Sequence, residues 1–274
     1  MSTLIVASGM TPTYTTGVPS VDIGVLRAIA SVTGLSFWGR PDNINAAPGG
    51  GYAWQFNDKR ASSTRTLRQP TGQTGTLTYR SDSGYLGGRP TIEASNGSDT
   101  RLDLSENVIP TTGPFAIYYA ITPLVGLCRI GGTTSSSSQL QIDLVSAQIR
   151  LKVANSGSGA DVTANVSGGN LSGRNVLIGF LRRTDTTSNR LVIRHKFAGS
   201  AWVETASSAF CTNDGLVGGT LRSIGSTLSV GVYTASAGYS FQSRLGQIMV
   251  FNQDLGTTNQ TLVEDYLADY HGMS

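Results

Sequence analysis

Charged residues are scarce in this chain of 274 residues, because Asp, Glu, Lys and Arg together make up 14% of it, against roughly a quarter in a typical soluble domain. The net charge is +3, and most of the basic residues are scattered along the sequence. Scattered basic residues without interleaved aromatic residues do not make a nucleic-acid footprint, so nucleic acid is not an expected partner. Low charge on a folded chain instead suggests that neighbouring subunits cover part of the surface, which predicts a homo-oligomer.

Cysteine and histidine are also rare. Cys128 and Cys211 are the only two cysteines, which is too few for a disulfide framework in a chain of this length. Each lies beside apolar residues and is expected to be a small buried side chain, although a bridge between the two stays open. Neither these residues nor His195 and His271 show the spacing of a zinc site, so we expect no metal and no cofactor.

Long apolar runs are absent as well. No stretch approaches the roughly 20 apolar residues that a membrane span needs, so we expect no membrane partner. The first ten residues lack the basic start and the apolar run of a signal peptide. We therefore expect the chain to be made in a host cytoplasm without a signal peptide.

Short alternating segments dominate what is present. Leu140, Ile142 and Leu144 share one face of an expected strand, while Gln141 and Asp143 take the other. Residues 148–154 repeat the pattern after a very short connection, which predicts a hairpin. Residues 176–183 and 190–197 flank a turn-rich piece and predict a second hairpin. Short strands at regular spacing with turn clusters between them indicate an antiparallel, all-β sandwich.

Two segments, 115–121 and 176–181, are apolar on both faces. Strands that are buried on both sides have such continuous apolar runs, so another element must cover their outer faces. The candidates are an N-terminal arm over residues 1–34, which contains a short apolar helix within 22–32, a C-terminal helix over 257–270, and another subunit.

The C-terminal helix is the clearest helix in the sequence. Thr257 and Gln260 predict a capping box at its start, and Gly272 predicts its end. Glu264 and Asp265 are expected on its solvated face. The apolar residues fall on one face of the helix, and these are Leu262, Val263, Tyr266, Leu267 and Tyr270.

Several short motifs follow one another in order along the chain. Gly84-Tyr-Leu-Gly-Gly-Arg-Pro leads into an expected strand, with Gly87 and Gly88 supplying a tight turn, and Asn96-Gly97 predicts a hairpin turn. The strongly apolar strand from Phe115, the segment Ser240–Phe251 and the ending Tyr266-Leu-Ala-Asp-Tyr-His-Gly272 complete the series. The series resembles the concanavalin A-like, or laminin-G-like, jelly roll over about residues 35–274. The resemblance implies an antiparallel two-sheet jelly-roll sandwich at 35–274, an N-terminal arm at 1–34 and a short C-terminal helix.

A domain of this fold that has low charge, an N-terminal arm and no signal peptide resembles bacteriophage virion proteins. The resemblance implies a non-enzymatic structural component of the virion, such as a tail, baseplate, fibre or head-decoration subunit. Its partners would be other virion proteins and copies of itself. The one concentrated set of basic residues would then lie on a solvated or subunit-facing loop and make assembly contacts, and it consists of Lys59, Arg60, Arg65 and Arg68.

A receptor- or polysaccharide-binding adhesin is the first alternative, with a host-surface glycan as partner. Sugars pack on exposed aromatic rings and hydrogen-bond to a few polar groups. The candidate ligand-binding residues are Trp202, Tyr233, Tyr239, Asn213 and Asp214. The last two are also candidate calcium ligands, and the competing interpretation is that all five are ordinary core, rim or turn residues. Trp38 and Trp54 lie in strand-like patterns and are expected in the core.

A glucanase-like hydrolase is the second alternative. Retaining glycosidases need two carboxyl groups close together, but none of the four glutamates lies in a clustered carboxylate motif. Asp103 and Glu106 are the nearest candidate pair, and Glu106 lies at an expected strand end. His195 shares a face with apolar neighbours and is expected to be structural. We therefore predict no catalytic residues and no enzymatic activity.

Overall fold

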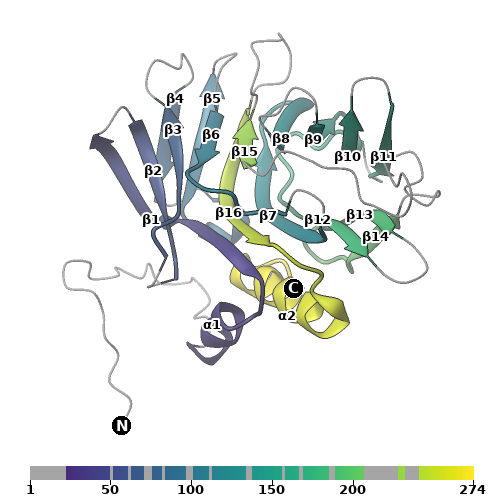
Figure 1. The fold of residues 1–274 in the computed structure, drawn as a ribbon. Coiled ribbons are helices and arrows are strands. Elements are labelled where there is room, and N and C mark those ends of the chain that lie inside the picture. Colours follow the sequence, from purple (N-terminus) through teal and green to yellow (C-terminus); the bar gives the residue numbers. More distant parts are fainter. Residues whose placement is uncertain are drawn as a thin grey trace.

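The computed structural model describes residues 23–49, 52–60, 63–70, 76–81, 84–96, 101–110, 113–133, 138–155, 158–166, 169–184, 189–206, 228–231 and 241–274. Within these residues the chain is mostly antiparallel β-structure with two α-helices at one side (Figure 1). The predicted all-β, antiparallel class is confirmed at this level.

The strands are β1 (Leu35–Gly49), β2 (Tyr52–Asp58), β3 (Thr66–Pro70), β4 (Thr76–Arg80), β5 (Thr91–Asn96), β6 (Arg101–Leu104), β7 (Phe115–Pro123), β8 (Leu127–Thr133), β9 (Ser138–Val145), β10 (Gln148–Asn155), β11 (Ser158–Asn165), β12 (Val176–Thr184), β13 (Asn189–Lys196), β14 (Val203–Ala206), β15 (Leu228–Gly231) and β16 (Ser243–Phe251). The helices are α1 (Ile23–Ala30) and α2 (Gly256–Tyr270), and a short 3-10 turn, η1 (Leu86–Gly88), precedes β5.

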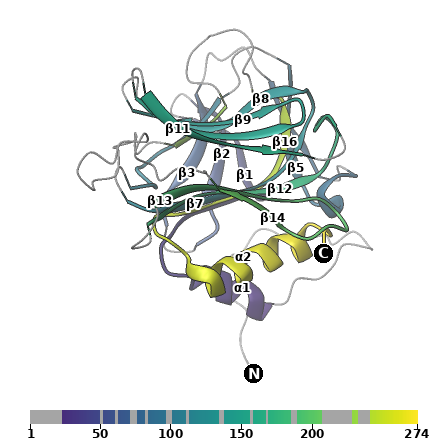
Figure 2. The same cartoon turned by 90° about the vertical axis from the view of Figure 1, so that its right-hand side faces the viewer.

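Hydrogen bonds link the strands in the order β11-β10-β9-β8-β15-β6-β3-β2-β1-β16-β7-β12-β13-β14, with β4 and β5 paired beside β16. The two ends of this order approach each other, because β11 contacts both β13 and β14. The sheet is therefore curved almost into a barrel. Figure 2 shows β8, β9 and β11 on one side of it, and β7, β12 and β13 on the other.

The main core lies inside the curved sheet. Strands β9 and β10 pair with each other along their length, and so do β12 and β13, which confirms both predicted hairpins. Ser146, in the two-residue turn between β9 and β10, has a φ of +54°, as such tight hairpin turns require. The inward side chains of this hairpin are at most 1% exposed, and these are Leu140, Ile142, Leu144, Ile149 and Leu151.

A second core lies on the outer side of β7, β12 and β16, beneath the helices (Figure 2). Strand β7 is buried along its whole length, and Tyr118 from it packs in one cluster with Leu177 from β12 and Leu267 from α2. Helix α1 contributes Ile29 and contacts α2. The chain's own helices therefore cover the segments that are apolar on both faces, as predicted for the C-terminal helix.

The C-terminal end of α2 is a Schellman motif. The N–H of Met273 donates to the carbonyl of Ala268 at 2.7 Å, and the N–H of Gly272 donates to the carbonyl of Asp269 at 3.2 Å. Gly272 has a φ of +59°, a left-handed conformation that this motif needs and that glycine adopts without strain. The predicted end of the helix at Gly272 is confirmed.

The N-terminal end of α2 differs from the prediction. The helix begins at Gly256 without a side-chain cap, so the capping box of Thr257 and Gln260 is wrong. The reason is that the Gln260 side chain donates to Glu264 at 3.0 Å instead of reaching back to the backbone. The N–H of Gly256 donates to the Asp254 carboxylate at 3.1 Å, which supplies part of the missing cap.

The turns around β5 give one confirmed and one corrected prediction. Gly87 and Gly88 have φ values of +69° and +72°, so the predicted tight turn is present. The predicted hairpin at Asn96-Gly97 is wrong, because β5 pairs with β4 and β16 whereas β6 pairs with β3 and β15. Strands β5 and β6 therefore lie in different parts of the sheet and do not pair with each other.

Candidate functional site

The side of the sheet away from the main core carries a row of polar residues that is interrupted by one glycine and in which Ser229 is itself buried. Register pairs place Gln55 opposite Arg68, then Asp103, Ser229, Gly132, Gln141 and Lys152 in turn across β2, β3, β6, β15, β8, β9 and β10. Their neighbours along each strand point into the main core, so this row points outward. We call it, with the outward residues beside it, the polar face, and it consists of Gln55, Arg68, Arg101, Asp103, Arg129, Gln141, Asp143, Arg150, Lys152 and Ser229.

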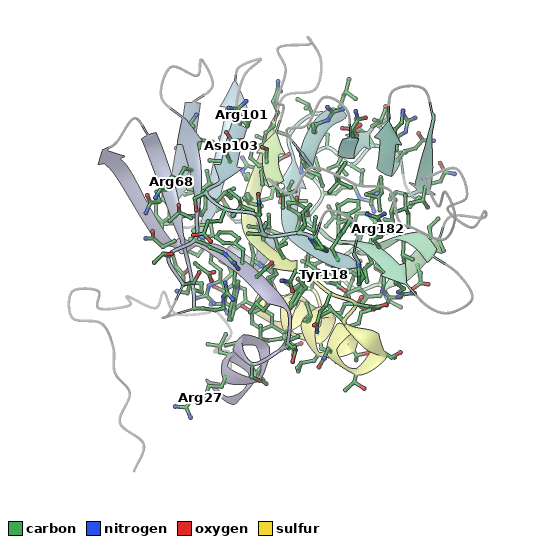
Figure 3. All side chains as sticks on the ribbon, viewed as in Figure 1. Arg27, Arg68, Arg101, Asp103, Tyr118 and Arg182 are labelled. Carbon is green, nitrogen blue, oxygen red and sulfur yellow. The ribbon has the colours of Figure 1, made fainter. Side chains whose placement is uncertain are left out.

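Ion pairs hold four of the charged side chains of the polar face in place. Arg129 binds Asp143 through two hydrogen bonds, from Nε to Oδ1 at 2.7 Å and from Nη2 to Oδ2 at 3.3 Å. Arg101 Nη2 lies 2.9 Å from Asp103 Oδ2, and the hydroxyl of Ser229 donates to Asp103 Oδ1 at 2.6 Å. The side chains of Arg101 and Asp103, which lie together on β6 in Figure 3, are 21% and 24% exposed. They are therefore oriented by the chain and still reach solvent.

The four basic residues predicted as assembly contacts do not form one patch. Arg68 lies on the polar face, opposite a carboxylate and an amide of neighbouring strands. Arg60 and Arg65 both donate to the carbonyl of Ser36 on β1, at 2.6 and 2.7 Å, and Lys59 makes an ion pair with β1 as well. All four therefore have interactions within the chain, and a role in assembly stays a prediction.

Trp202 belongs to the second core. Its indole packs edge-on against Tyr118, with ring centroids 6.4 Å apart, and the Arg194 guanidinium lies 5.9 Å from the indole centroid. The ring is half-buried among these contacts, so packing against the second core is enough to explain its position. Its role as a platform for a sugar stays a prediction. The other predicted ligand-binding residues lie outside the described part of the chain, and these are Tyr233, Tyr239, Asn213 and Asp214.

A buried ion pair beside Trp202 ties α2 to the sheet. Arg194 on β13 binds Glu264 through two hydrogen bonds, from Nε at 2.6 Å and from Nη2 at 2.7 Å. Gln260 and the hydroxyl of Tyr118 donate to the same carboxylate at 3.0 and 3.3 Å. Glu264 is only 3% exposed, so its predicted place on the solvated face is wrong. We call Arg194, Glu264, Gln260 and Tyr118 the helix latch.

Glu204 and Arg183 extend the helix latch toward solvent. Glu204 accepts hydrogen bonds from Arg183 at 3.1 Å and from Arg194 at 3.0 Å. Burial alone would raise the pKa of Glu204, but the two arginines hold it below its ordinary value. Burial, with the charge of Glu264, raises the pKa of Tyr118 well above its ordinary value, so this phenol stays a neutral donor. The latch is therefore a structural network in which each charge has its partner.

The remaining candidates for chemistry lie apart from one another. Asp103 pairs with Arg101 on the polar face, whereas Glu106 pairs with Arg65, just before the start of β3, at 3.0 Å. His195 is buried, and burial together with a nearby arginine lowers its pKa. Cys128 is a free thiol whose pKa burial raises to about 12, and Cys211 lies outside the described residues.

Across the described ranges, no three His, Cys, Asp or Glu side chains are placed to hold a metal ion. In the same part of the chain, no helix is long and apolar enough to cross a membrane.

The sequence pattern marks the individual residues of the polar face as outward-facing, but it does not show that they lie side by side in the fold. The alternation of Gln141 with Asp143, and of Arg150 with Lys152, marks outward positions on one hairpin. The run Arg-Leu-Asp-Leu at 101–104 alternates in the same way. These segments become one surface only because β15, from residues 228–231, pairs between β6 and β8.

Comparison with protein-family models finds no match for this chain, and comparison with curated protein sequences finds none either. Solved structures with a similar fold include the receptor-binding domain of botulinum neurotoxin D, at 10% identity and a TM-score of 0.52 over 89% of this chain and 53% of that one. The chain spans about half the length of the neurotoxin binding domains that it resembles.

Two further structures are similar. One is domain 4 of AbnA, an extracellular GH43 arabinanase from Geobacillus stearothermophilus, in complex with arabinotriose, at 11% identity and a TM-score of 0.51 over 85% of this chain and 98% of that one. The other is the enzymatically active domain of Bacteriophage CBA120 tailspike protein 2, at 14% identity and a TM-score of 0.53 over 73% of this chain and 30% of that one. At these identities the likeness shows the fold alone, and that fold is an all-β one shared with binding domains.

Proposed function

We propose that this chain is a non-enzymatic saccharide-binding module and that the polar face is its binding surface. The observation that carries the proposal is the row of six polar residues and one glycine in register across seven strands. Neighbouring strands lie about 4.8 Å apart, so the six intervals from Gln55 to Lys152 span about 29 Å. Sugar hydroxyls both donate and accept hydrogen bonds. An extended saccharide therefore suits a long row in which amides, carboxylates and cations follow one another.

The spacing of the carboxylates supports binding rather than hydrolysis. Asp103 on β6 and Asp143 on β9 are separated by three strand intervals, which is about 14 Å. Glycosidases place their two carboxyl groups about 5 to 9.5 Å apart. Both carboxylates are also paired with an arginine, Asp143 with Arg129 at 2.7 Å and Asp103 with Arg101 at 2.9 Å, so neither stands next to the other as a catalytic pair would. We therefore propose no catalytic residues on this face.

We further propose that the curved sheet is a two-sheet jelly roll of the concanavalin A-like class and that the module serves as an adhesin in a bacteriophage virion. The fold likeness to a phage tailspike domain and to a domain solved with arabinotriose supports this placement. Its partners are then other virion proteins, copies of itself and a glycan on the host surface. The low share of charged residues, 14%, is consistent with extensive contact with neighbours.

A purely structural virion subunit is the second candidate, and the edge of the sheet favours it. In the described ranges β14 hydrogen-bonds to β13 alone, although β11 also contacts it, and its Val203 is 47% exposed. Open edges with apolar side chains pair readily with other chains, and a lysine blocks such pairing. This role predicts a stable oligomer in mass photometry that Val203→Lys dissociates. A wild-type chain that stays monomeric at micromolar concentration contradicts it.

A glycan array with the purified full-length chain tests the binding function. We expect the wild type to bind a defined set of glycans and Gln141→Ala, on the polar face, to weaken that binding at least fivefold. Gln253→Ala is the matched control, because this glutamine lies at the helix side and donates to the carbonyl of Thr33. An array without any bound glycan, or equal binding by both variants, contradicts the proposal.

A further inference from the structure

We propose that the saccharide recognised by the polar face is acidic and that its carboxylate groups bind the arginine side chains there; this inference rests on the proposed function. The charge of the face is the first observation. The register places Asp161 opposite Lys152 at the edge of the polar face, and it is counted here with the face. The basic residues then outnumber the acidic ones by two. The basic residues are Arg68, Arg101, Arg129, Arg150 and Lys152, and the acidic ones are Asp103, Asp143 and Asp161.

The chemistry of these cations is the second observation. Four of the five are arginines, whose planar fork matches the two oxygens of a carboxylate better than the point charge of lysine does. Arg129 and Arg101 are held by their neighbours at 2.7 and 2.9 Å and are 19% and 21% exposed. A guanidinium that is already oriented loses less entropy when a ligand binds. The face is therefore prepared for planar anions.

The third observation concerns what the face offers to a neutral sugar. None of its described outward residues is aromatic, so this part of the chain supplies no ring for stacking. Binding must then rely on hydrogen bonds, and hydrogen bonds to a charged partner are roughly twice as strong as neutral ones. A ligand that bears carboxylates adds the attraction between opposite charges to its hydrogen bonds with the arginines, whereas a neutral ligand does not.

The carboxylates on the face favour a saccharide over a nucleic acid. Asp103 and Asp143 lie among the arginines, and a single-stranded nucleic acid with one phosphate per nucleotide would place phosphates against them. An acidic saccharide with carboxylates on only some of its sugar units avoids this repulsion. Its hydroxyls in between can donate to the two aspartates.

The test uses an array in which carboxylated glycans are printed beside neutral counterparts that lack only the carboxyl group. We expect the wild type to bind carboxylated members at least tenfold more tightly than their neutral counterparts. The best pair is then measured by calorimetry in 50 and 500 mM NaCl, together with a single-stranded DNA 20-mer. Binding to the acidic glycan should weaken with salt, and the DNA should bind at least tenfold more weakly.

Three variants of single residues separate the outcomes. Arg68→Gln should weaken binding of the acidic glycan about tenfold or more, because it removes a charged hydrogen-bond donor. Arg27→Gln makes the same change of charge on α1, far from the polar face (Figure 3), and should leave binding within twofold. Asp103→Asn should tighten binding of the acidic glycan, since it removes a repulsive charge and keeps an oxygen that can accept from the hydroxyls.

Each result decides between the inference and the proposed function. If neutral counterparts bind as well as acidic ones and Asp103→Asn weakens them, the polar face binds saccharides but the inference of an acidic ligand is wrong. If DNA binds as tightly as the glycan, or Arg27→Gln weakens binding as much as Arg68→Gln does, the surface is a general polyanion binder and the inference fails. If no glycan binds at all, the proposed function fails with it.

Discussion

Removing the cation of the helix latch should destabilise the protein strongly. In Arg194→Met, a side chain of similar length that lacks the charge replaces a guanidinium that donates twice to Glu264, at 2.6 and 2.7 Å. The side chain of Glu264 is only 4% exposed, so it would remain as a buried carboxylate with weaker donors around it. Breaking a buried ion pair by removing one partner costs about 3–5 kcal/mol.

The loss of stability can be measured by thermal unfolding or by unfolding in urea. For a chain of this size, each kcal/mol lowers Tm by about 2–4 °C, so the low end of the range predicts a fall of about 6–12 °C. Arg183→Met is the matched control. Its partner Glu204 and Arg183 itself are 36% and 28% exposed, and an exposed pair contributes only about 0–1 kcal/mol.

A double variant completes the test. Arg194→Met combined with Glu264→Met removes both charges from the same place and should recover much of the lost stability, because buried ion pairs are often replaceable by apolar side chains. If Arg194→Met costs no more than Arg183→Met, α2 does not depend on the latch and the reasoning is wrong.

Three further predictions follow from buried groups in the described part of the chain. A Cβ on Gly131 would lie 2.5 Å from the hydroxyl of Tyr119, and this hydroxyl has no hydrogen-bond partner among the described residues. Gly131→Ala should therefore lower the free energy of unfolding by urea by about 1–3 kcal/mol. Adding Tyr119→Phe should restore part of the lost stability. Burial lowers the pKa of His271 to about 3, whereas the same histidine in the unfolded chain takes up its proton near pH 6.5. About 2 kcal/mol of stability should therefore be lost between pH 7 and pH 5. His271→Gln should make the free energy of unfolding less dependent on pH in this range. Cys128 should resist iodoacetamide at pH 8 until the chain is unfolded, since burial holds the pKa of its thiol near 12, and rapid labelling of the native chain at this residue, read by mass spectrometry, would contradict its burial.

The sequence predicts those parts of the fold whose signals lie within a few residues. The hairpin of β9 and β10 follows from alternation on both sides of a two-residue turn, and the end of α2 follows from Gly272. The apolar runs of β7 and β12 also predict that another element covers them. Each of these features depends on local geometry or on simple burial, so composition and periodicity suffice.

The wrong predictions concern residues whose partners are distant in sequence. Glu264 looks like a surface residue of its helix, but its charge is balanced inside the fold by Arg194, which lies 70 positions earlier in the sequence. Asn96-Gly97 is a good turn sequence, but β5 and β6 each have other partners in the sheet. The polar face needs the strand order itself, because Asp103 and Ser229 are 126 positions apart.

Two regions on the outer side of the curved sheet use the same ion-pair chemistry with different results, and the burial of the paired groups makes the difference. In the helix latch the side chains of Arg194 and Glu264 are 17% and 4% exposed, so their pairing is needed for the stability of the fold and is closed to a ligand. On the polar face Arg101 and Asp103 are 21% and 24% exposed, so their pairing adds little stability and both groups can exchange water for a ligand. Arg101→Gln should therefore change glycan binding with almost no change of Tm, whereas Arg194→Met should lower Tm and, measured well below that Tm, leave binding unchanged. A polar-face variant that lowers Tm as far as the latch variant does would show that this division of roles is wrong.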